Sequence, residues 1–359
     1  MDDPLLIVRG TSAQRSRTIS LALLWVAVLG YPVAWHKSDI GTSVRWIGAH
    51  LSLDENEIVV SIPSDKLEDL AERTWHLCET PTASKKSVRS LCGGLAFVSG
   101  LVCFLRPFCS SLWAALSEKS EGCNDDAQRT SGEPTSRRKK RLPSHLVFTK
   151  RFKHSLLWLT AFFSRCIGPL ERRFPLSLDN QAPCLHVSTD ASPWGIGGVL
   201  VVNGEITSYF ADHITELDLR RFNASVGVSD FNTIWEALAI LVAVRTWRAS
   251  IHCFAKFHVR SDSLSAIRAL VKLSSSAPSI NTIARELALD CAQLLQEPSV
   301  YEHTPGVANK LPDALSRLYA PVPSEIPAVL GNVRMAKLAV RDSSFWRTTK
   351  LPQGTSQPR

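Results

Sequence analysis

The sequence lacks several features that would place it in a protein class at once. Its nine cysteines include no Cys-x-x-Cys pair and no regular spacing, so they indicate neither a zinc site nor a disulfide framework and favour a reducing compartment. We find no internal repeat. The apolar run from Leu21 to Trp35 follows several arginines, as in a signal peptide, but no small-x-small cleavage site follows it. Gly30 and Pro32 interrupt the run, which is also short for a membrane span. We therefore expect an intracellular protein, cytoplasmic or nuclear, with no membrane partner.

Composition and charge indicate a globular chain that contacts nucleic acid. The 359 residues are 45% hydrophobic, which allows a large core and two or three domains. The net charge of +8 is uneven, because residues 183–320 hold 11 Lys and Arg against 13 Asp and Glu while the rest of the chain holds 30 against 20. Such asymmetry fits an acidic catalytic part with flanks that contact phosphates. A solvated basic surface is the alternative.

Three strands are predicted at the start of the C-terminal half. Residues 184–189, 195–202 and 205–210 are rich in apolar and β-branched residues, and Asn203-Gly204 favours a type I′ hairpin turn between the last two. Asp190 ends the first strand. The pattern therefore predicts three antiparallel strands with a carboxylate at one end.

Three further acids stand in comparable positions. Glu236 lies in a predicted helix, residues 231–247, that is apolar on every side, so its carboxylate would be costly to bury unless paired or bound to a metal. Asp262 ends a short predicted strand, residues 256–261, and Asp313 begins a helix. All four acids can converge at one edge of a sheet.

Each acid also has a plainer explanation. Asp190 can form the turn before Ser192-Pro193, Asp262 can cap the following helix, and Asp313 can face a helix dipole from the first turn. Glu236 is the hardest to explain in this way, because its neighbours leave no polar face. The set of four is more persuasive than any single member.

The order of these elements resembles the ribonuclease H domain of retrotransposon polyproteins. The resemblance covers residues 183–320 and rests on Thr-Asp-Ala-Ser at 189–192 and on His-Thr-Pro-Gly-x-x-Asn-x-x-x-Asp-Ala-Leu-Ser-Arg at 303–317. It implies an α/β fold, a ribonuclease H-like mixed five-stranded sheet with flanking helices. In that family four acids bind two Mg²⁺ ions, with Mn²⁺ as a possible substitute, and a mobile histidine assists. The matching residues here are Asp190, Glu236, Asp262, Asp313 and His303.

The implied reaction is two-metal endonucleolytic hydrolysis of the RNA strand of RNA–DNA hybrids. Carboxylates suit Mg²⁺, and His303 would move a proton or help release product, unless it is an ordinary loop histidine. Selection of RNA requires contacts to 2′-hydroxyls in the minor groove of the hybrid. Gly195, Gly197 and Gly198 either let the backbone approach a strand of the substrate or serve packing.

The N-terminal part resembles a partial reverse transcriptase region with α+β and helical character. Residues 1–116 are similar to the end of the palm followed by the thumb and connection, which would make Asp2 and Asp3 remnants of the polymerase site. The fingers and the first palm acid would lie before residue 1, so polymerisation is not expected of this chain. The remaining predicted segments are a basic disordered linker at 117–144, a connecting helical segment at 145–182 and a tail without motifs at 321–359.

Two other functions compete with a ribonuclease. A catalytically inactive nucleic-acid-binding remnant of a retroelement would be indicated by the loss of an acid, and none of the four is lost. A transposase or integrase needs a different late arrangement of acids, and the segment 303–317 argues against it. The expected partners are an RNA–DNA hybrid and the rest of a retroelement polyprotein.

Overall fold

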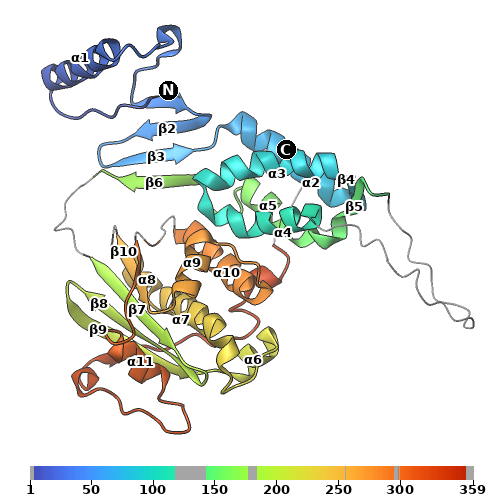
Figure 1. Ribbon diagram of the computed structural model, residues 1–359, viewed down its shortest axis with the longest axis vertical. Coiled ribbons are helices and arrows are strands. Elements are labelled where there is room, and N and C mark those ends of the chain that lie inside the picture. The colour runs from blue at the N-terminus through green and yellow to red at the C-terminus, as the bar shows by residue number, and fades with distance from the viewer. Residues whose placement is uncertain are drawn as a thin grey trace, which may run out of the picture. The chain divides into compact units, whose positions relative to one another are not determined.

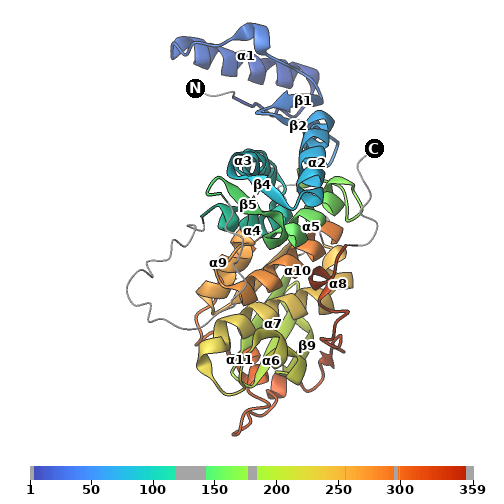
Figure 2. The same cartoon turned by 90° about the vertical axis from the view of Figure 1, so that its right-hand side faces the viewer.

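The chain folds into two compact units, residues 1–64 with 171–177 and residues 65–170 with 178–359. The computed structural model (Figures 1 and 2) describes residues 4–117, 143–176, 184–254, 256–294, 298 and 300–352. Asp2, Asp3 and nearly all of the predicted linker therefore lie outside the described residues. Within the described ranges, no helix combines the length and the apolar character needed to cross a membrane.

The smaller unit is a four-stranded antiparallel sheet with one helix. The strand order is β1-β2-β3-β6, and the elements are α1 (Ser12–Val28), η1 (Trp35–Lys37), β1 (Ser43–Trp46), β2 (Ala49–Leu53), β3 (Glu57–Ser61) and β6 (Glu171–Pro175). Helix α1 begins at a capping box, in which the Thr11 hydroxyl accepts a hydrogen bond from the Gln14 amide at 3.3 Å. Strand β6 comes from far along the sequence, out of the segment predicted as a helical connection at 145–182.

The larger unit begins with helices that share an aromatic core. Its first elements are α2 (Ser64–Glu79), β4 (Thr82–Ser84), α3 (Lys85–Leu101), η2 (Cys103–Leu105), α4 (Arg106–Ser117), β5 (Leu146–Phe148), η3 (Thr149–Arg151) and α5 (Lys153–Phe163). The rings of Phe108 and Phe162 lie 5.3 Å apart, and those of Phe108 and Trp158 lie 5.8 Å apart. Aromatic packing thus joins α4 to α5.

A mixed six-stranded sheet forms the rest of the larger unit, where the sequence predicted five strands. The order is β11-β10-β7-β8-β9-β12, with β7 (Leu185–Ala191), β8 (Gly195–Val202), β9 (Glu205–His213), β10 (Phe257–Ser261), β11 (Val300–His303) and β12 (Arg334–Met335). Strands β7, β8 and β9 are antiparallel, and Asn203 and Gly204 have φ angles of 52° and 88°, as a type I′ turn requires. The additional strand, β12, comes from the predicted tail.

Helices cover both faces of this sheet. They are α6 (Glu216–Phe222), η4 (Ser229–Phe231), α7 (Asn232–Thr246), α8 (Arg248–His252), α9 (Leu264–Lys272), α10 (Pro278–Leu294), α11 (Lys310–Ser316), η5 (Ala328–Leu330) and η6 (Arg347–Thr349). Helix α7 packs on β7 and β8 and is buried from Trp235 to Val244, as its all-round apolar pattern predicts. On the opposite face, α11 packs over β7, β8 and β9, and its Leu315 joins a core cluster with Val199 and Leu330.

Two glycines of β8 allow α11 to approach the sheet. A Cβ atom at Gly197 would lie 2.6 Å from the Cβ of Leu315, and one at Gly195 would lie 2.7 Å from the carbonyl oxygen of Ser316. A Cβ at Gly198 would meet the Phe210 ring at 2.4 Å. These glycines therefore serve packing, the second of the two explanations that the sequence left open.

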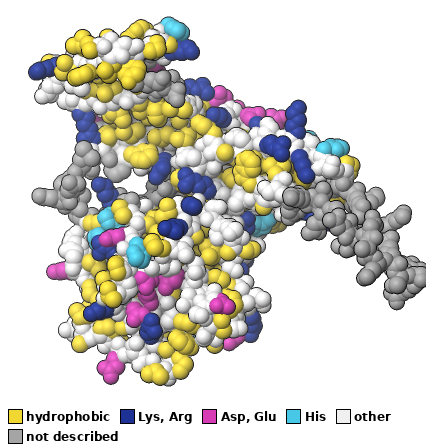
Figure 3. Space-filling model, viewed as in Figure 1, with side chains coloured by type: hydrophobic (Ala, Val, Ile, Leu, Met, Phe, Trp, Pro, Cys, Tyr) yellow, Lys and Arg dark blue, Asp and Glu magenta, His cyan; other side chains and the backbone are white. Residues whose placement is uncertain are grey.

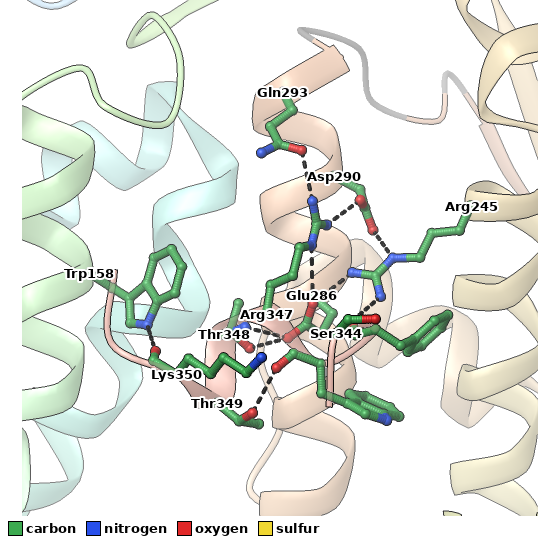
Figure 4. A network of polar contacts seen from close by, with 12 residues as sticks. Trp158, Arg245, Glu286, Asp290, Gln293, Ser344, Arg347, Thr348, Thr349 and Lys350 are labelled. Atoms are coloured by element: carbon green, nitrogen blue, oxygen red, sulfur yellow. Dashed lines mark hydrogen bonds and ion pairs between the residues drawn. The ribbon is translucent and has the colours of Figure 1, made fainter. Parts of the chain in front are cut away.

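The segment predicted as a tail packs against the sheet and helices of the larger unit. Arg341 is buried and donates to Asp218 at 2.8 Å and to Asp212 at 2.6 Å. Figure 4 shows the next contacts: Glu286 of α10 accepts from the backbone amide of Thr348 at 2.6 Å, and the Trp158 indole donates to the carbonyl of Lys350 at 3.2 Å. The segment up to residue 352 is thus part of this unit. It is attached by hydrogen bonds and ion pairs between residues that are distant in the sequence.

Candidate metal centre

Strand β7 carries the first candidate ligand, Asp190, to the α11 face of the sheet. Asp190 stands opposite Gly197 in the ladder, so its side chain shares the face on which Gly197 meets α11. It is 4% exposed, and its carboxylate accepts hydrogen bonds from Ser316 Oγ at 2.8 Å and from Asn309 Nδ2 at 3.3 Å. The turn after it is held by Ser192, whose hydroxyl accepts from the Gly195 amide at 3.1 Å. Asp190 is therefore not needed as the turn former.

Glu236 reaches the same place from the helix on the other face. It is 6% exposed within α7, and Oε1 accepts from the backbone amide of Ala191 at 3.1 Å. Its second oxygen, Oε2, accepts from Ser261 Oγ at 3.3 Å. These two bonds aim the carboxylate at the carboxyl ends of β7 and β10.

Asp262 follows β10 directly and completes a cluster. Ligand oxygens of Asp190, Glu236 and Asp262 all lie within 4.8 Å of one another. The N-cap of α9 is Ser263, whose hydroxyl accepts from the Ala266 amide at 3.3 Å. Asp262 is therefore not occupied in capping, and its carboxylate is available to the cluster.

Asp313, the fourth predicted acid, lies beside this cluster but is not one of the three. It stands in the first turn of α11, its side chain is 42% exposed, and it accepts from Arg317 Nε at 2.6 Å. Its charge contributes to raising the pKa of Asp190. The structure thus brings three predicted acids together and leaves the fourth at the rim, beside an arginine.

His303 lies at the end of β11 on the exposed side of the site. It stands opposite Ser261 in the parallel ladder, and the amide of the next residue, Thr304, donates to the Ser261 carbonyl at 3.0 Å. The loop that follows touches the cluster, since a Cβ at Gly306 would lie 3.5 Å from a carboxylate oxygen of Asp262. The histidine is exposed and close in the fold to Asp262, but it makes no contact that fixes its role.

Sequence reasoning gave no role to two residues that hold Asp190. Asn309 and Ser316 are both buried, and Asn309 also donates to the carbonyl of Thr189 at 3.1 Å. Both stand in the segment 303–317 on which the resemblance was based. Their spacing from Asp313 was visible, but a hydrogen-bond partner more than a hundred residues away was not.

The electrostatics of the cluster oppose its own ionisation. Burial is the largest cause that raises the pKa of Asp190 from 3.8 to about 7, and the charges of Asp262 and Asp313 add to it. Burial also raises the pKa of Glu236 well above its usual value, with further contributions from Asp190 and Asp262. In the described part of the chain, no Lys or Arg forms an ion pair with Asp190, Glu236 or Asp262. Figure 3 shows the patch of Asp and Glu side chains on this face of the larger unit, with His side chains near it.

Such an arrangement can bind divalent cations. Three carboxylates that form no ion pair in the described residues offer hard oxygen ligands, which Mg²⁺ and Mn²⁺ prefer. A bound cation would add positive charge between them and would lower the pKa of both buried acids. The donor set therefore fits the metal that the sequence predicts.

Comparisons with known proteins give distant structural similarities. No family model and no curated protein matches the sequence. The ribonuclease H1 of the halophilic archaeon Halobacterium salinarum NRC-1 is similar at 19% identity and a TM-score of 0.30, over 38% of this chain and 96% of that chain. The foamy viral protease-reverse transcriptase in complex with an RNA/DNA hybrid is similar at 13% identity and a TM-score of 0.33, over 84% of this chain and 35% of that chain.

The foamy viral protein in complex with double-stranded DNA gives a comparable result, with 14% identity and a TM-score of 0.32. That similarity covers 83% of this chain and 53% of the viral chain. This chain thus spans 35% of one viral structure and 53% of the other. At TM-scores this low, function is inferred from the geometry of the site and not from these similarities.

Proposed function

We propose that the larger unit is a ribonuclease H that hydrolyses the RNA strand of RNA–DNA hybrids with two divalent metal ions. Asp190, Glu236 and Asp262 would bind the ions, and Asp313 would complete the set from α11. His303 would move a proton or help release product. The chain would act as part of a retroelement reverse transcriptase polyprotein.

One observation carries this proposal: three carboxylates converge at the carboxyl ends of two parallel strands, and in the described residues none of the three forms an ion pair with Lys or Arg. Burying carboxylates without ion pairs costs free energy, so a fold that retains two of them, Asp190 and Glu236, beside the partly exposed Asp262 indicates a function that uses them. Hydrolysis of a phosphodiester is such a function, because divalent ions can activate a water and offset the charge that develops on the phosphate.

The residues around the acids would keep the site in a binding-competent geometry. Ser316 and Asn309 fix both oxygens of Asp190, and the Ala191 amide with Ser261 fixes both oxygens of Glu236. All four donors are neutral, so none of them competes with a cation for the negative charge. The carboxylates are thereby positioned before any ion binds.

The test is cleavage of a labelled RNA–DNA hybrid by the full chain in magnesium, with Asp190→Asn beside the parent. The full chain is used because residues up to 352 pack against the larger unit. Asp230→Asn is the matched control, since Asp230 is exposed in η4 and outside the cluster. We expect metal-dependent cleavage of the RNA strand by the parent and the control, and none by Asp190→Asn or in EDTA.

Double-stranded DNA and double-stranded RNA of the same sequence serve as substrate controls and should remain intact. A folded parent that binds the hybrid but leaves it intact in Mg²⁺ and in Mn²⁺ would refute the ribonuclease. The alternative, a catalytically inactive nucleic-acid-binding retroelement remnant, would then explain the chain. Equal cleavage by Asp190→Asn would show that the activity resides elsewhere.

A further inference from the structure

A second cluster of potential metal ligands lies on the same sheet, apart from the acids. Cys184 precedes β7, His186 is the second residue of β7, and His258 is the second residue of β10. One ligand atom from each lies within 4.8 Å of the others, and the three side chains are partly exposed. His186 and His258 stand directly opposite each other in the parallel ladder.

Strand geometry explains why the three side chains meet. Residues two apart on a strand share a face, so Cys184 and His186 point to the same side, and the register adds His258 from the neighbouring strand. The imidazole ring centroids are 4.9 Å apart and the rings are nearly perpendicular. The strands therefore hold the ligands close to one another before any ion binds.

One nitrogen in this cluster lacks a partner. Nδ1 of His186 is buried and accepts or donates no hydrogen bond in the described part of the chain. A buried polar atom without a partner costs free energy, so a ligand that occupies it is favoured. The charge of the Arg260 guanidinium acts on both histidines. Arg260 itself is paired with Glu302 at 2.8 Å.

We propose that Cys184, His186 and His258 bind a zinc ion with a fourth position open to water or an added ligand. One thiolate and two imidazoles are the donors that Zn²⁺ prefers, whereas Mg²⁺ prefers the oxygens of the acidic cluster. Tetrahedral bonds of about 2.0–2.3 Å hold ligand atoms roughly 3.3–3.8 Å apart, which small side-chain rotations here would achieve.

The proposed zinc site is distinct from the hydrolytic one. Asp190 lies four positions after His186, and Asp262 lies four positions after His258, which corresponds to about 13 Å along the strands. Neither His186 nor His258 contacts the acidic cluster in the described structure. Zinc binding would therefore survive the loss of the acids, and it does not depend on the proposed ribonuclease activity.

Cobalt titration of the full metal-free chain is the first test. We expect a single Co²⁺ per chain that gives a thiolate-to-metal charge-transfer band and the intense visible bands of tetrahedral cobalt, and Zn²⁺ should displace it. Cys184→Ser and His258→Gln should lose these bands. Cys253→Ser and His252→Gln are the matched controls, because both residues are exposed at the end of α8, and they should keep the bands, as should Asp190→Asn.

Alkylation of Cys184 provides a second test that needs no variant to fold. In the parent chain, Zn²⁺ should slow modification of Cys184, identified by peptide mass, and leave that of Cys253 unchanged. Absence of the charge-transfer band, its persistence in Cys184→Ser, or equal alkylation with and without Zn²⁺ would overturn the proposal. The histidines would then be only an edge-to-face aromatic pair.

Discussion

Two groups of buried carboxylates in the larger unit differ in what surrounds them. Glu286 and Asp290 of α10 are 0% and 2% exposed, and both face arginines: Arg245 donates to Glu286 at 2.6 Å and to Asp290 at 2.7 Å. Arg347 adds a second cation to Asp290 (Figure 4). Asp190 and Glu236 are buried to a similar degree but accept hydrogen bonds from neutral donors.

The difference teaches how to separate structural acids from functional ones. Burial alone does not distinguish the two groups. Where arginines neutralise the carboxylates, the charges join α7, α10 and the segment at 344–350 into one structure. Where the carboxylates form no ion pair in the described residues, the fold keeps a local excess of negative charge that a metal ion can bind.

Replacing one glutamate of each group with glutamine should change a different property in each case, the cleavage rate in one and the stability in the other. These are the largest effects that we expect. Glu236→Gln should lower the rate of hybrid cleavage by about 10³-fold or more, because several kcal/mol of metal-dependent stabilisation is lost. Glu286→Gln should instead lower the free energy of unfolding by about 3–5 kcal/mol, because Arg245 would lose a buried counter-charge. Cleavage assays and urea unfolding of both variants make the comparison.

Control measurements keep the two effects apart. Glu236→Gln should unfold at the same or a higher urea concentration than the parent without metal, because the amide removes a charge that burial disfavours. If Glu236→Gln is strongly destabilised, or if Glu286→Gln is as stable as the parent, the two groups do not differ in this way.

Stability should depend on pH and magnesium together, with a smaller effect. Burial raises the pKa of Asp190 from 3.8 in the unfolded chain to about 7 in the fold, so the folded state binds the proton more tightly. The stability that this proton contributes is complete below the unfolded pKa and is lost as the pH rises from about 4 to about 7. Magnesium, which binds the ionised form, should raise the free energy of unfolding by about 1.4 kcal/mol at ten times its dissociation constant.

Thermal unfolding at pH 5 and pH 8, with and without Mg²⁺, measures this linkage. The magnesium-dependent rise in melting temperature should be larger at pH 8, and Asp190→Asn should reduce that difference. If the rise is the same at both pH values, the metal does not bind the ionised Asp190.

Local patterns were enough to predict most of the acidic cluster. Asp190 and Asp262 stand at the ends of strands with a strong apolar pattern, and Glu236 interrupts a helix with no polar face. Each acid alone had a plainer explanation, and only the set indicated a common site. Whether these residues and Asp313 are catalytic stays a prediction. Two plainer explanations failed on geometry, because Ser192 holds the turn and Ser263 caps the helix.

Features that depend on distant pairing were missed. The pair His186 and His258 arises from the register of two parallel strands that are about seventy residues apart, and no spacing rule for zinc sites covers it. The strand β12 and the buried Arg341 lie in a segment without periodicity. Their positions follow from partners in β9 and α6, which local propensity does not reveal.

The last effect concerns His303, which lies at the exposed end of β11, outside both groups of acids. His303→Ala should lower turnover by about 10²-fold, the low end of what a general acid or base contributes, because Thr304 and Gly306 bring its loop against Asp262. Binding of the hybrid and the melting temperature should stay unchanged, since the imidazole is exposed. His252→Ala, another exposed histidine, is the control. Equal turnover by the two variants would make His303 an ordinary loop residue, and the chemistry would then rest on the carboxylates alone.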